Sequence, residues 1–448
     1  MAYYGFVAQG DTSSASDCRV AYNELSSKYN SANVQIAGFS TSSDTPLSNR
    51  ANQSNFINAK DYHVLYWSSH GNSTPALNVI NGPYFESYTT AYNNWRNTGN
   101  TLKVPIFAAC YQFDGDTNRH RWANNIMRHS DIRAMCGYHE SAPSSTDATI
   151  AQKFFDYCCE GSTGNSVMYS WKNANATTSG GSSYIVLVYY DNNRCYYRLP
   201  GFSTTTYDDP NRSTTKIYRY TRANPNGAEV PKTLSLSINS APYSLTPTSN
   251  SCKMLNVSKW NPKQTIRVGQ NENAFFYGLR ECSMKPVSSE QGRAYNIELL
   301  QDLVGGEMLA SASLNIYDDA MAEVHQDDLP EKDITIGSTT QVFQQYNGII
   351  LEENCIAACS DATGVISLTN QWQEYTISKN VDHIDLLNTE LPVFNSFFKE
   401  EPSKSEGKLT IKSVTPIYIR IHDKYNLHYD VKFSNGQCSM VDAKQLSR

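Results

Sequence analysis

The sequence has little that points to a membrane, to nucleic acid or to a metal. No window approaches eighteen uninterrupted apolar residues, so no segment is predicted to span a bilayer. The 448-residue chain has a formal net charge of −6 and no long basic run, which argues against nucleic acid or an anionic membrane surface as the main partner. Cysteine and histidine do not stand together at zinc-site spacing, and the sequence predicts neither a metal nor a cofactor.

The chain also lacks a repeat of fixed period and a recognisable leader. Residues Met1–Val7 have neither the basic head nor the long apolar core of a signal peptide, and they are predicted to form the first strand. The compartment stays open between the cytoplasm and, if a leader has been removed, secretion or the cell surface. The 11 cysteines are an odd number, so at least one thiol is expected to be unpaired. Most of the cysteines are expected to be ordinary buried thiols. The sequence does not indicate an oligomeric state.

What the sequence does contain is a regular alternation of short apolar runs and helical segments over its first 200 residues. This spacing predicts an α/β fold with a largely parallel sheet covered by helices on both faces. The predicted strands are Tyr4–Ala8, Val34–Ala37, His63–Trp67, Val104–Ala109, Ile132–Cys136 and Tyr184–Tyr190. The predicted helices begin near Ser14 and cover Tyr88–Trp95, Arg121–Arg128, Asp147–Tyr157 and Ser166–Ala174.

The composition changes after residue 205. Residues 206–232 are rich in Ser, Thr, Asn and Tyr and poor in aliphatic residues, which favours a linker or insertion. Residues 233–448 are predicted to form one or two α+β modules with a regulatory or binding role. Their predicted elements are alternating segments at Thr233–Ser240 and Asp333–Ile336, helices at Ala294–Leu303 and Leu386–Phe398, and a hairpin of Lys408–Arg420 with Leu427–Phe433.

Two of the apolar runs end on chemically reactive residues. The run His63–Trp67 continues into His70 and Gly71, and the run Val104–Ala109 continues into Cys110. In parallel sheets, ligands and chemistry gather just beyond the carboxyl ends of the strands. If the two strands are neighbours, His70 and Cys110 therefore share one rim of the sheet.

A thiol and an imidazole at one rim are sufficient for acyl-transfer chemistry. Hydrolysis of an amide through a thiol needs a thiolate, a base that can also protonate the leaving amine, and donors for the developing oxyanion. Cys110 and His70 are the candidate nucleophile and base, and the backbone amides of Gly71 and Cys110 are the candidate oxyanion donors. Gly71 suits this role because a residue without Cβ lets a substrate carbonyl approach the main chain closely.

An apolar strand that ends in His70-Gly71, followed by one that ends in Ala109-Cys110, resembles the clan CD cysteine peptidases of the caspase, gingipain, legumain and clostripain superfamily. Caspases carry Q-A-C-[RQG]-G with the histidine about fifty residues upstream. Here the small residue and the cysteine match, while the flanking Ala108 and Tyr111 do not. The resemblance covers residues 1–205 and implies a caspase-like domain of a distant, bacterial-type member, with a His70–Cys110 dyad and the Gly71 and Cys110 amides as oxyanion hole.

The resemblance also implies where specificity residues lie. In this superfamily the loop after the first strand lines the pocket for the residue before the scissile bond, and here it contains Asp11 and Asp17. His139 and Glu140 end a neighbouring strand on the same rim and are candidate substrate-binding residues. A carboxylate at the pocket floor selects lysine or arginine through a charge-assisted hydrogen bond, so a basic residue before the scissile bond is expected, with Asp11 the best single candidate.

These features lead to one main hypothesis and two rivals. The main hypothesis is a cysteine endopeptidase that hydrolyses protein or peptide substrates. The first rival is a non-enzymatic binding or scaffold protein on a caspase-like shell, because the tyrosine-rich segments Tyr84–Tyr92 and Tyr189–Tyr197 suit a recognition surface. The second rival is a Cys–His acyltransferase or amidase, which the same rim would equally support.

Overall fold

The structure, a computed structural model of the chain, describes the greater part of the sequence. The described residues are 2–9, 12–30, 33–44, 46–47, 52–71, 76–77, 85–139, 142–143, 146–159, 166–176, 178, 184–189, 197–202, 214–223, 240–249, 252, 255–260, 262, 264–268, 274–280, 283, 285–325, 333–386, 411–421, 424–433 and 438–446. Among these residues, no helix is both long and apolar enough to cross a membrane.

The first half of the chain builds a parallel sheet in the order β2-β1-β3-β6-β7. Each adjacent pair is parallel, as predicted from the alternation. Strands β3, β6 and β7 are buried along their whole length, because apolar residues occupy both faces of each strand. The bounds are Tyr3–Ala8 for β1, Asn33–Ala37 for β2, Val64–Ser68 for β3, Val104–Ala108 for β6 and Ala134–Tyr138 for β7.

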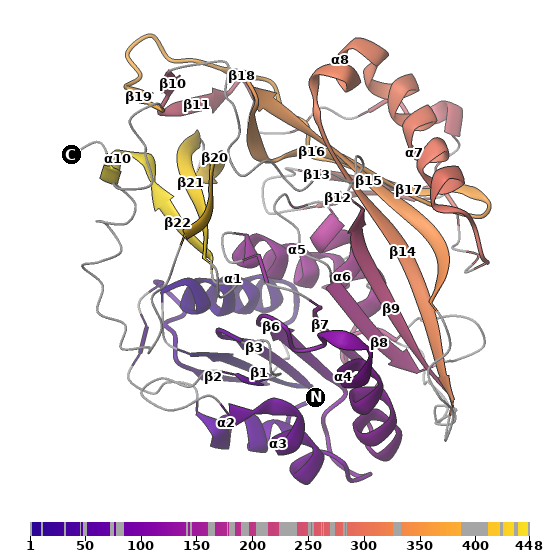
Figure 1. Cartoon of the computed structure of the whole chain (residues 1–448). Helices are drawn as coiled ribbons and strands as arrows, with labels where there is room; N and C mark the ends of the chain where they lie inside the picture. The colour runs from indigo at the N-terminus through magenta and orange to yellow at the C-terminus, as the bar shows by residue number, and fades with distance from the viewer. Residues whose placement is uncertain are drawn as a thin grey trace.

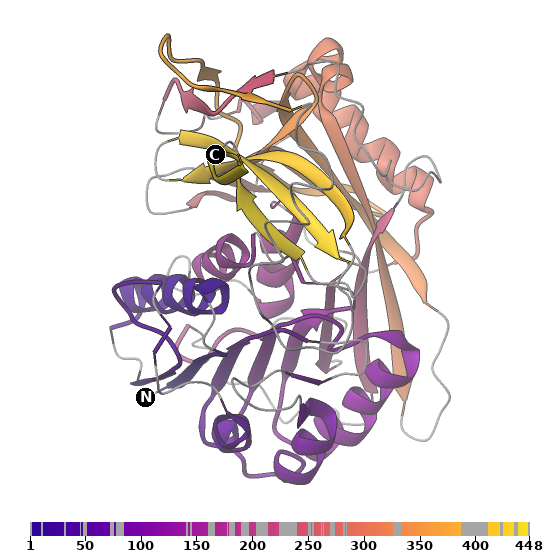
Figure 2. The ribbon, with the colours of Figure 1, turned by 60° about the vertical axis from the view of Figure 1, so that its left-hand side comes forward.

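Helices cover both faces of this parallel sheet, which Figure 2 shows edge-on. One face packs against α1 (Thr12–Lys28), α5 (Asp147–Cys159) and α6 (Val167–Ala176). The other face packs against α2 (Gln53–Asn58), α3 (Ser87–Asn94) and the helical segment that follows β6. That segment comprises α4 (Gly115–Arg121), a π-helical turn (Trp122–Ile126) and a 3-10 turn (Met127–His129), and a 3-10 turn (Ala59–Asp61) follows α2.

The sheet as a whole is mixed and mostly antiparallel, so the largely parallel sheet predicted for the first 200 residues is one part of a larger sheet, and its predicted last strand, β8, is antiparallel. Beyond β7, strand β8 runs antiparallel, and the strands that continue the sheet through β9, β14, β15, β16, β17, β13 and β12 are antiparallel to their neighbours. The α/β class is confirmed, and the five strands around the candidate site are the part of this sheet that is parallel throughout. The bounds are Tyr184–Tyr189 for β8, Gln264–Val268 for β12, Ala274–Gly278 for β13, Ser313–His325 for β14, Ile334–Tyr346 for β15, Ile349–Asp361 for β16 and Gly364–Asn370 for β17.

Strand β9 (Thr214–Ala223) lies inside the segment 206–232, which the composition predicted to be a linker or insertion. It pairs with β8 on one side and with β14 on the other, so it joins the first half of the chain to the second in one sheet. The linker prediction is therefore corrected for these 10 residues. The strand was not predicted because this segment has few aliphatic residues. Threonine, which is β-branched, and tyrosine, which is aromatic, are nevertheless common in strands.

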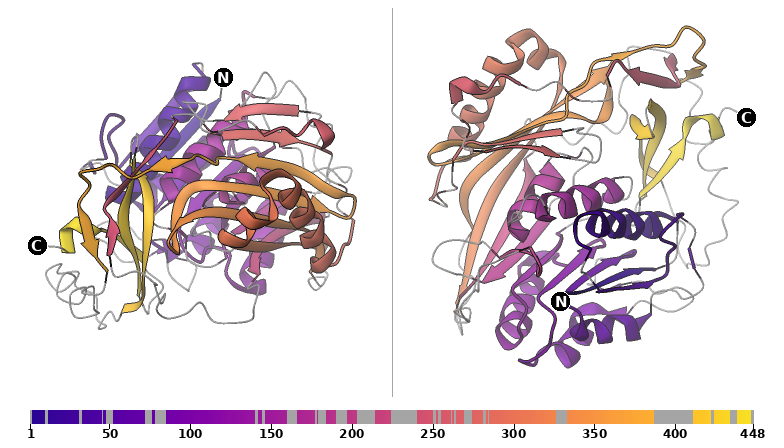
Figure 3. Two further views of the ribbon diagram at one scale, coloured as in Figure 1. Left: turned by 90° about the horizontal axis from the view of Figure 1, so that it is seen from above. Right: turned by 180° about the vertical axis from the view of Figure 1, so that it is seen from behind.

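The second half of the chain adds helices and a smaller sheet. Helix α7 (Ser289–Val304), predicted as Ala294–Leu303, packs with α8 (Gly306–Ser311) on the outer face of β15–β17, and Figure 1 shows both on the side away from α5 and α6. The predicted hairpin is confirmed as β20 (Ile411–Ile421) with β21 (Lys424–Phe433), and β22 (Cys438–Asp442) pairs with β21. Figure 3 shows these strands in yellow on the same side of the parallel sheet as α1. The predicted segments Thr233–Ser240 and Leu386–Phe398 lie almost wholly outside the described residues. Short elements complete the fold at Ala76–Leu77 (β4), Phe85–Glu86 (β5), Ser240–Pro242 (β10), Ser244–Pro247 (β11), Ser258–Trp260 (3-10), Tyr375–Thr376 (β18), His383–Asp385 (β19) and Ala443–Leu446 (α10).

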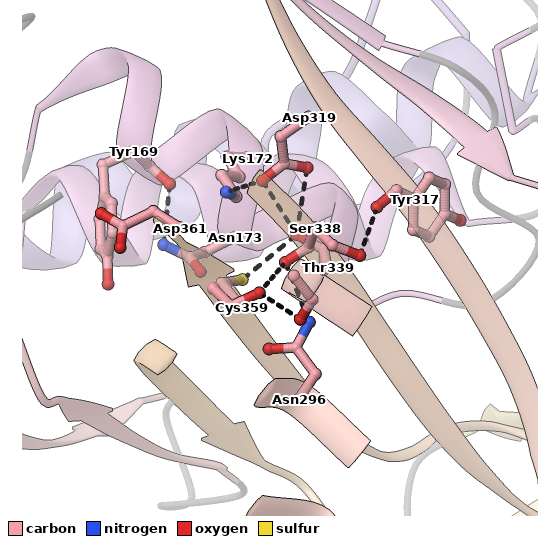
Figure 4. Close-up of polar contacts among 12 residues, drawn as sticks. Tyr169, Lys172, Asn173, Asn296, Tyr317, Asp319, Ser338, Thr339, Cys359 and Asp361 are labelled. Carbon is pink, nitrogen blue, oxygen red and sulfur yellow. Dashed lines mark hydrogen bonds and ion pairs between the residues drawn. The ribbon is translucent and has the colours of Figure 1, made fainter. Parts of the chain in front are cut away.

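Buried polar side chains join α6 to the antiparallel sheet (Figure 4). Lys172 on α6 pairs with Asp319 on β14, and the hydroxyl of Thr339 on β15 donates to the same carboxylate at 3.4 Å. Gln341 on β15 donates to the carbonyl oxygens of residues at the end of α6. The two halves of the chain are therefore packed together through specific polar contacts as well as through a shared sheet.

Candidate active site

The candidate site lies where β3 and β6 end side by side. The two strands are parallel and in register, with Ser68 opposite Ala108 as the last pair, and the backbone N–H of Ser69 donates to the Ala108 carbonyl at 3.3 Å. His70 and Cys110 each stand two residues beyond that pair. The predicted neighbouring strands are thus confirmed, and both residues emerge at the same rim.

The residue pattern along the two strands also favours one common face. Side chains alternate along a strand, and the Ser68 hydroxyl faces α1, where it donates to Asp17 Oδ2 at 2.7 Å. Continued past the end of β3, the same alternation predicts that the side chain of His70 also faces α1. Cys110 packs against the hydrophobic cluster between the sheet and helices α1, α5 and α6. The thiol thus lies on the α1 side of the sheet, and the imidazole is predicted to lie on that side too.

Gly71 lies directly against the backbone of Cys110. A Cβ built on Gly71 would come within 2.1 Å of the Cys110 carbonyl oxygen and within 2.9 Å of the Gln112 side-chain nitrogen. Any other residue at position 71 would force these two segments apart. Glycine is required here by the close approach of two backbones, a stronger reason than the open path for substrate that the sequence suggested.

The backbone of His70 is held by the residue that follows β1. The His70 N–H donates to the side-chain oxygen of Gln9 at 3.2 Å, while the Gln9 N–H donates to the Ser68 carbonyl at 3.0 Å. Gln9 is only 4% exposed, so water competes little for these contacts. Gln9 therefore holds the end of β3 through two hydrogen bonds, one to the Ser68 carbonyl and one from the His70 N–H.

Cys110 differs from the other cysteines in its exposure. It is partly exposed, and its sulfur accepts the backbone N–H of Ala142 at 3.2 Å from the loop after β7. Burial raises the pKa of the Cys136 and Cys159 thiols well above the usual range and that of Cys252 to about 12. The other cysteines whose side chains are described, Cys18, Cys136, Cys158, Cys159, Cys252, Cys355 and Cys359, are all buried. Within this set, Cys110 is the thiol that a reagent can reach.

Two buried carboxyl groups lie below the rim on the same face. Asp17 on α1 is 3% exposed, and Asp147, the first residue of α5, is 6% exposed and accepts a hydrogen bond from the Tyr138 hydroxyl at 3.2 Å. Burial raises the pKa of Asp147 to about 7. Burial also raises the pKa of Tyr66 on β3, and the charges of both carboxylates add to that effect. Asp17 and Asp147 therefore lie close to the same strand that delivers His70.

The remaining predicted substrate-binding residues have different outcomes. His139 follows β7, and its Nδ1 lies 3.3 Å from Asp114 Oδ1 at the start of α4. Because β6 lies between β3 and β7, Cys110 emerges between His70 on one side and His139 on the other. Asp11 and Glu140 fall outside the described residues. Among those that are described, no group of three or more His, Cys, Asp and Glu side chains could hold a metal ion.

Three polar residues of the rim were missed in the sequence. Gln9, Gln112 and Asp147 are buried, and each makes a hydrogen bond to a segment that borders the candidate dyad. The sequence does give a signal for two of them. Gln9 directly follows the first strand, and Gln112 stands two residues after the candidate nucleophile. Asp147 stands at a helix start, where aspartate is common for capping alone, so its position gave no distinction.

No protein-family model matches the chain, and no curated protein matches it in sequence. The arrangement at the rim must therefore be judged on its own chemistry. It combines a reachable thiol, a histidine that follows the neighbouring strand, and backbone N–H groups next to a glycine that lies against the backbone of Cys110. These are the parts that nucleophilic acyl transfer requires.

Proposed function

We propose that the protein is a cysteine endopeptidase in which Cys110 is the nucleophile and His70 is the general base and acid. The single observation that carries this proposal is the contact of Gly71 with the Cys110 carbonyl, because it brings the His70-Gly71 segment against the nucleophile's own backbone. The resemblance to the clan CD peptidases, and a caspase-like arrangement of the first domain, are part of the same proposal.

The proposed reaction has two halves. His70 takes the thiol proton, the Cys110 thiolate attacks the scissile carbonyl carbon, and the backbone N–H groups of Gly71 and Cys110 stabilise the oxyanion. His70 then gives its proton to the leaving amine, which leaves a thioester on Cys110. Water, deprotonated by His70, attacks the thioester, and the thiol and the new carboxyl terminus are released.

We also propose a preference for lysine or arginine before the scissile bond. Support comes from Asp17 and Asp147, two carboxyl groups beneath the rim on the face to which Cys110 packs. Asp17 is the better ligand for a cation at neutral pH, because the pKa of Asp147 is raised to about 7 and that group is half neutral there. Asp11 and Glu140 stay candidates for the same pocket, and His139 for contact with substrate.

The test is cleavage of a peptide library by wild type, Cys110→Ala and His70→Ala, read by mass spectrometry. Wild type should cut after lysine or arginine, and each substitution should abolish cutting. Cleavage that survives both substitutions would refute the Cys110–His70 dyad. Cleavage by wild type after residues other than lysine or arginine would refute only the proposed preference for a basic residue. If no peptide is cut, a selective reaction of Cys110 with an acyloxymethyl-ketone probe would favour the transferase or amidase, and an inert thiol would favour a binding protein. A competing amine in the reaction separates transfer from hydrolysis.

A further inference from the structure

Gln112 is a fully buried amide two residues after Cys110, and every part of its side-chain amide is engaged. It is 0% exposed, and its Nε2 donates to the Cys110 carbonyl at 3.0 Å and to the Ala76 carbonyl at 3.3 Å. Its Oε1 accepts a hydrogen bond from the Ser87 hydroxyl at 2.7 Å. Both donors and the acceptor of a buried amide are thus used, and all three partners come from the surroundings of the nucleophile.

These contacts converge on one carbonyl group. Gln112 approaches the Cys110 oxygen from one side, while the Gly71 Cα lies close enough that a Cβ there would be 2.1 Å from the same oxygen. Gly71 also forms a β-bridge with Leu77, the residue after Ala76. The amide of Gln112 therefore links the nucleophile's peptide group to the strand that the His70-Gly71 segment pairs with.

The backbone beside Cys110 needs such a constraint. Tyr111 has φ 60°, a left-handed conformation that is rare and unfavourable for a bulky residue. A strained residue keeps its conformation only where the surroundings hold it. Because the Cys110 carbonyl belongs to the same peptide group as the Tyr111 nitrogen, the hydrogen bond from Gln112 holds that peptide plane.

We propose that Gln112 is a positioning residue that sets the orientation of the Cys110 backbone relative to Gly71, and with it the geometry of the nucleophile and the oxyanion donors. This inference rests on the proposed function of Cys110 and Gly71. Gln112 acts through its hydrogen bond to the Cys110 carbonyl and does not itself bind the substrate or the thiol. Displacement of a catalytic group by about 1 Å can cost roughly 100-fold in rate, so a lost constraint here should be visible in turnover.

The experiment compares Gln112→Met, Gln112→Glu and Ser87→Ala with wild type in the full chain. Methionine keeps the length of the glutamine side chain but removes its N–H donors. Glutamate replaces the NH₂ group that donates to the Cys110 and Ala76 carbonyls with an oxygen that can only accept. Ser87→Ala removes only the hydroxyl that orients the amide. We expect kcat on a wild-type peptide substrate to fall about 10- to 100-fold in Gln112→Met, more in Gln112→Glu and only a few-fold in Ser87→Ala, with KM changed less than kcat.

A second readout does not require cleavage. The pH profile of Cys110 alkylation by iodoacetamide reports the thiolate and depends on how the thiol is placed relative to His70, so the profile of Gln112→Met should differ from that of wild type. The matched control is Asn296→Leu, because Asn296 is an equally buried amide whose Nδ2 donates to the Ser338 carbonyl at 3.0 Å and to the Thr340 hydroxyl at 3.2 Å on the far side of the antiparallel sheet. It should lower the melting temperature without moving kcat or the profile.

The outcomes separate the two proposals. If Cys110→Ala and His70→Ala abolish cleavage while Gln112→Met keeps the wild-type kcat and alkylation profile, the positioning role is refuted and the peptidase stands. If cleavage survives in Cys110→Ala, the peptidase is refuted whatever Gln112 does. If the Gln112 variants do not fold, Ser87→Ala decides: an unchanged kcat and profile in that folded variant would overturn the inference.

Discussion

The buried pair of Lys172 and Asp319 gives the sharpest test of how the two halves of the chain are joined. Lys172 on α6 is 7% exposed and Asp319 on β14 is 1% exposed (Figure 4). The Lys172 ammonium also lies 5.1 Å from the centre of the Tyr220 ring on β9. Burial raises the pKa of Asp319, and the ammonium and the Thr339 hydroxyl oppose that rise. Each charge is therefore stable here mainly because the other is present.

The perturbation is the removal of one partner at a time, by Lys172→Met or Asp319→Asn. An uncompensated buried charge typically costs about 3–5 kcal/mol, whereas an uncharged pair of similar shape is often tolerated. Unfolding entropy is roughly 2.1 cal/mol/K per residue, which is about 0.9 kcal/mol/K for all 448 residues unfolding as one unit. Each single variant should therefore lower the melting temperature by about 3–5 °C, and Lys172→Met/Asp319→Asn should recover part of the loss.

The two single variants should respond to pH in opposite directions. In Lys172→Met the Asp319 carboxyl keeps a folded pKa above its unfolded value, so its stability is present at low pH and is lost as pH rises. In Asp319→Asn the buried Lys172 ammonium has no carboxylate partner, so burial should hold its folded pKa below the unfolded value, and stability should be lost as pH falls. The assay is the melting temperature by differential scanning calorimetry between pH 5 and 9. Equal losses with the same pH trend, or losses that simply add in the double variant, would refute the reasoning.

Two further predictions concern the rim. Gly71→Ala should reduce cleavage at least about 100-fold, because its Cβ would come within 2.1 Å of the Cys110 carbonyl oxygen. The control is Gly306→Ala, whose Cβ would meet no atom within 4 Å and which should leave turnover unchanged. Wild-type turnover in Gly71→Ala would show that the close approach is not needed. Asp147 has its pKa raised from 3.8 to about 7, so wild type should lose stability between about pH 4 and pH 7 on the order of 4 kcal/mol from this group alone. Asp147→Asn, which can still accept from Tyr138, should flatten that loss in urea denaturation at pH 5 and pH 8, and an unchanged difference between the two pH values would contradict the assignment.

Much of the candidate site follows from local patterns in the sequence. The apolar runs that become β3 and β6 are bounded by small residues, and a run buried on both faces predicts a parallel strand without knowledge of its partners. Because chemistry gathers at the carboxyl ends of such strands, His70, Gly71 and Cys110 could be chosen from the sequence alone. Helix α5, whose apolar residues recur along one face, was predicted for the same reason.

What the sequence could not supply were contacts between segments that are far apart along the chain. Strand β9 is a strand because β8 and β14 supply its hydrogen-bond partners, and its own composition resembles a loop. The predicted largely parallel sheet failed beyond β7 because the direction in which β8 returns is a tertiary property.

The sequence by itself determined the candidate residues and the strands that carry them, since side-chain periodicity is a local property of the backbone. Only the tertiary structure decided that Gly71 meets the Cys110 carbonyl, that Gln9 and Gln112 hold the two strand ends, and that one mixed sheet joins both halves of the chain. Apart from the local hydrogen bond from Gln112 to the Cys110 carbonyl, these features depend on hydrogen bonds and close packing between residues separated by tens of positions or more, and the fold determines which of those residues meet.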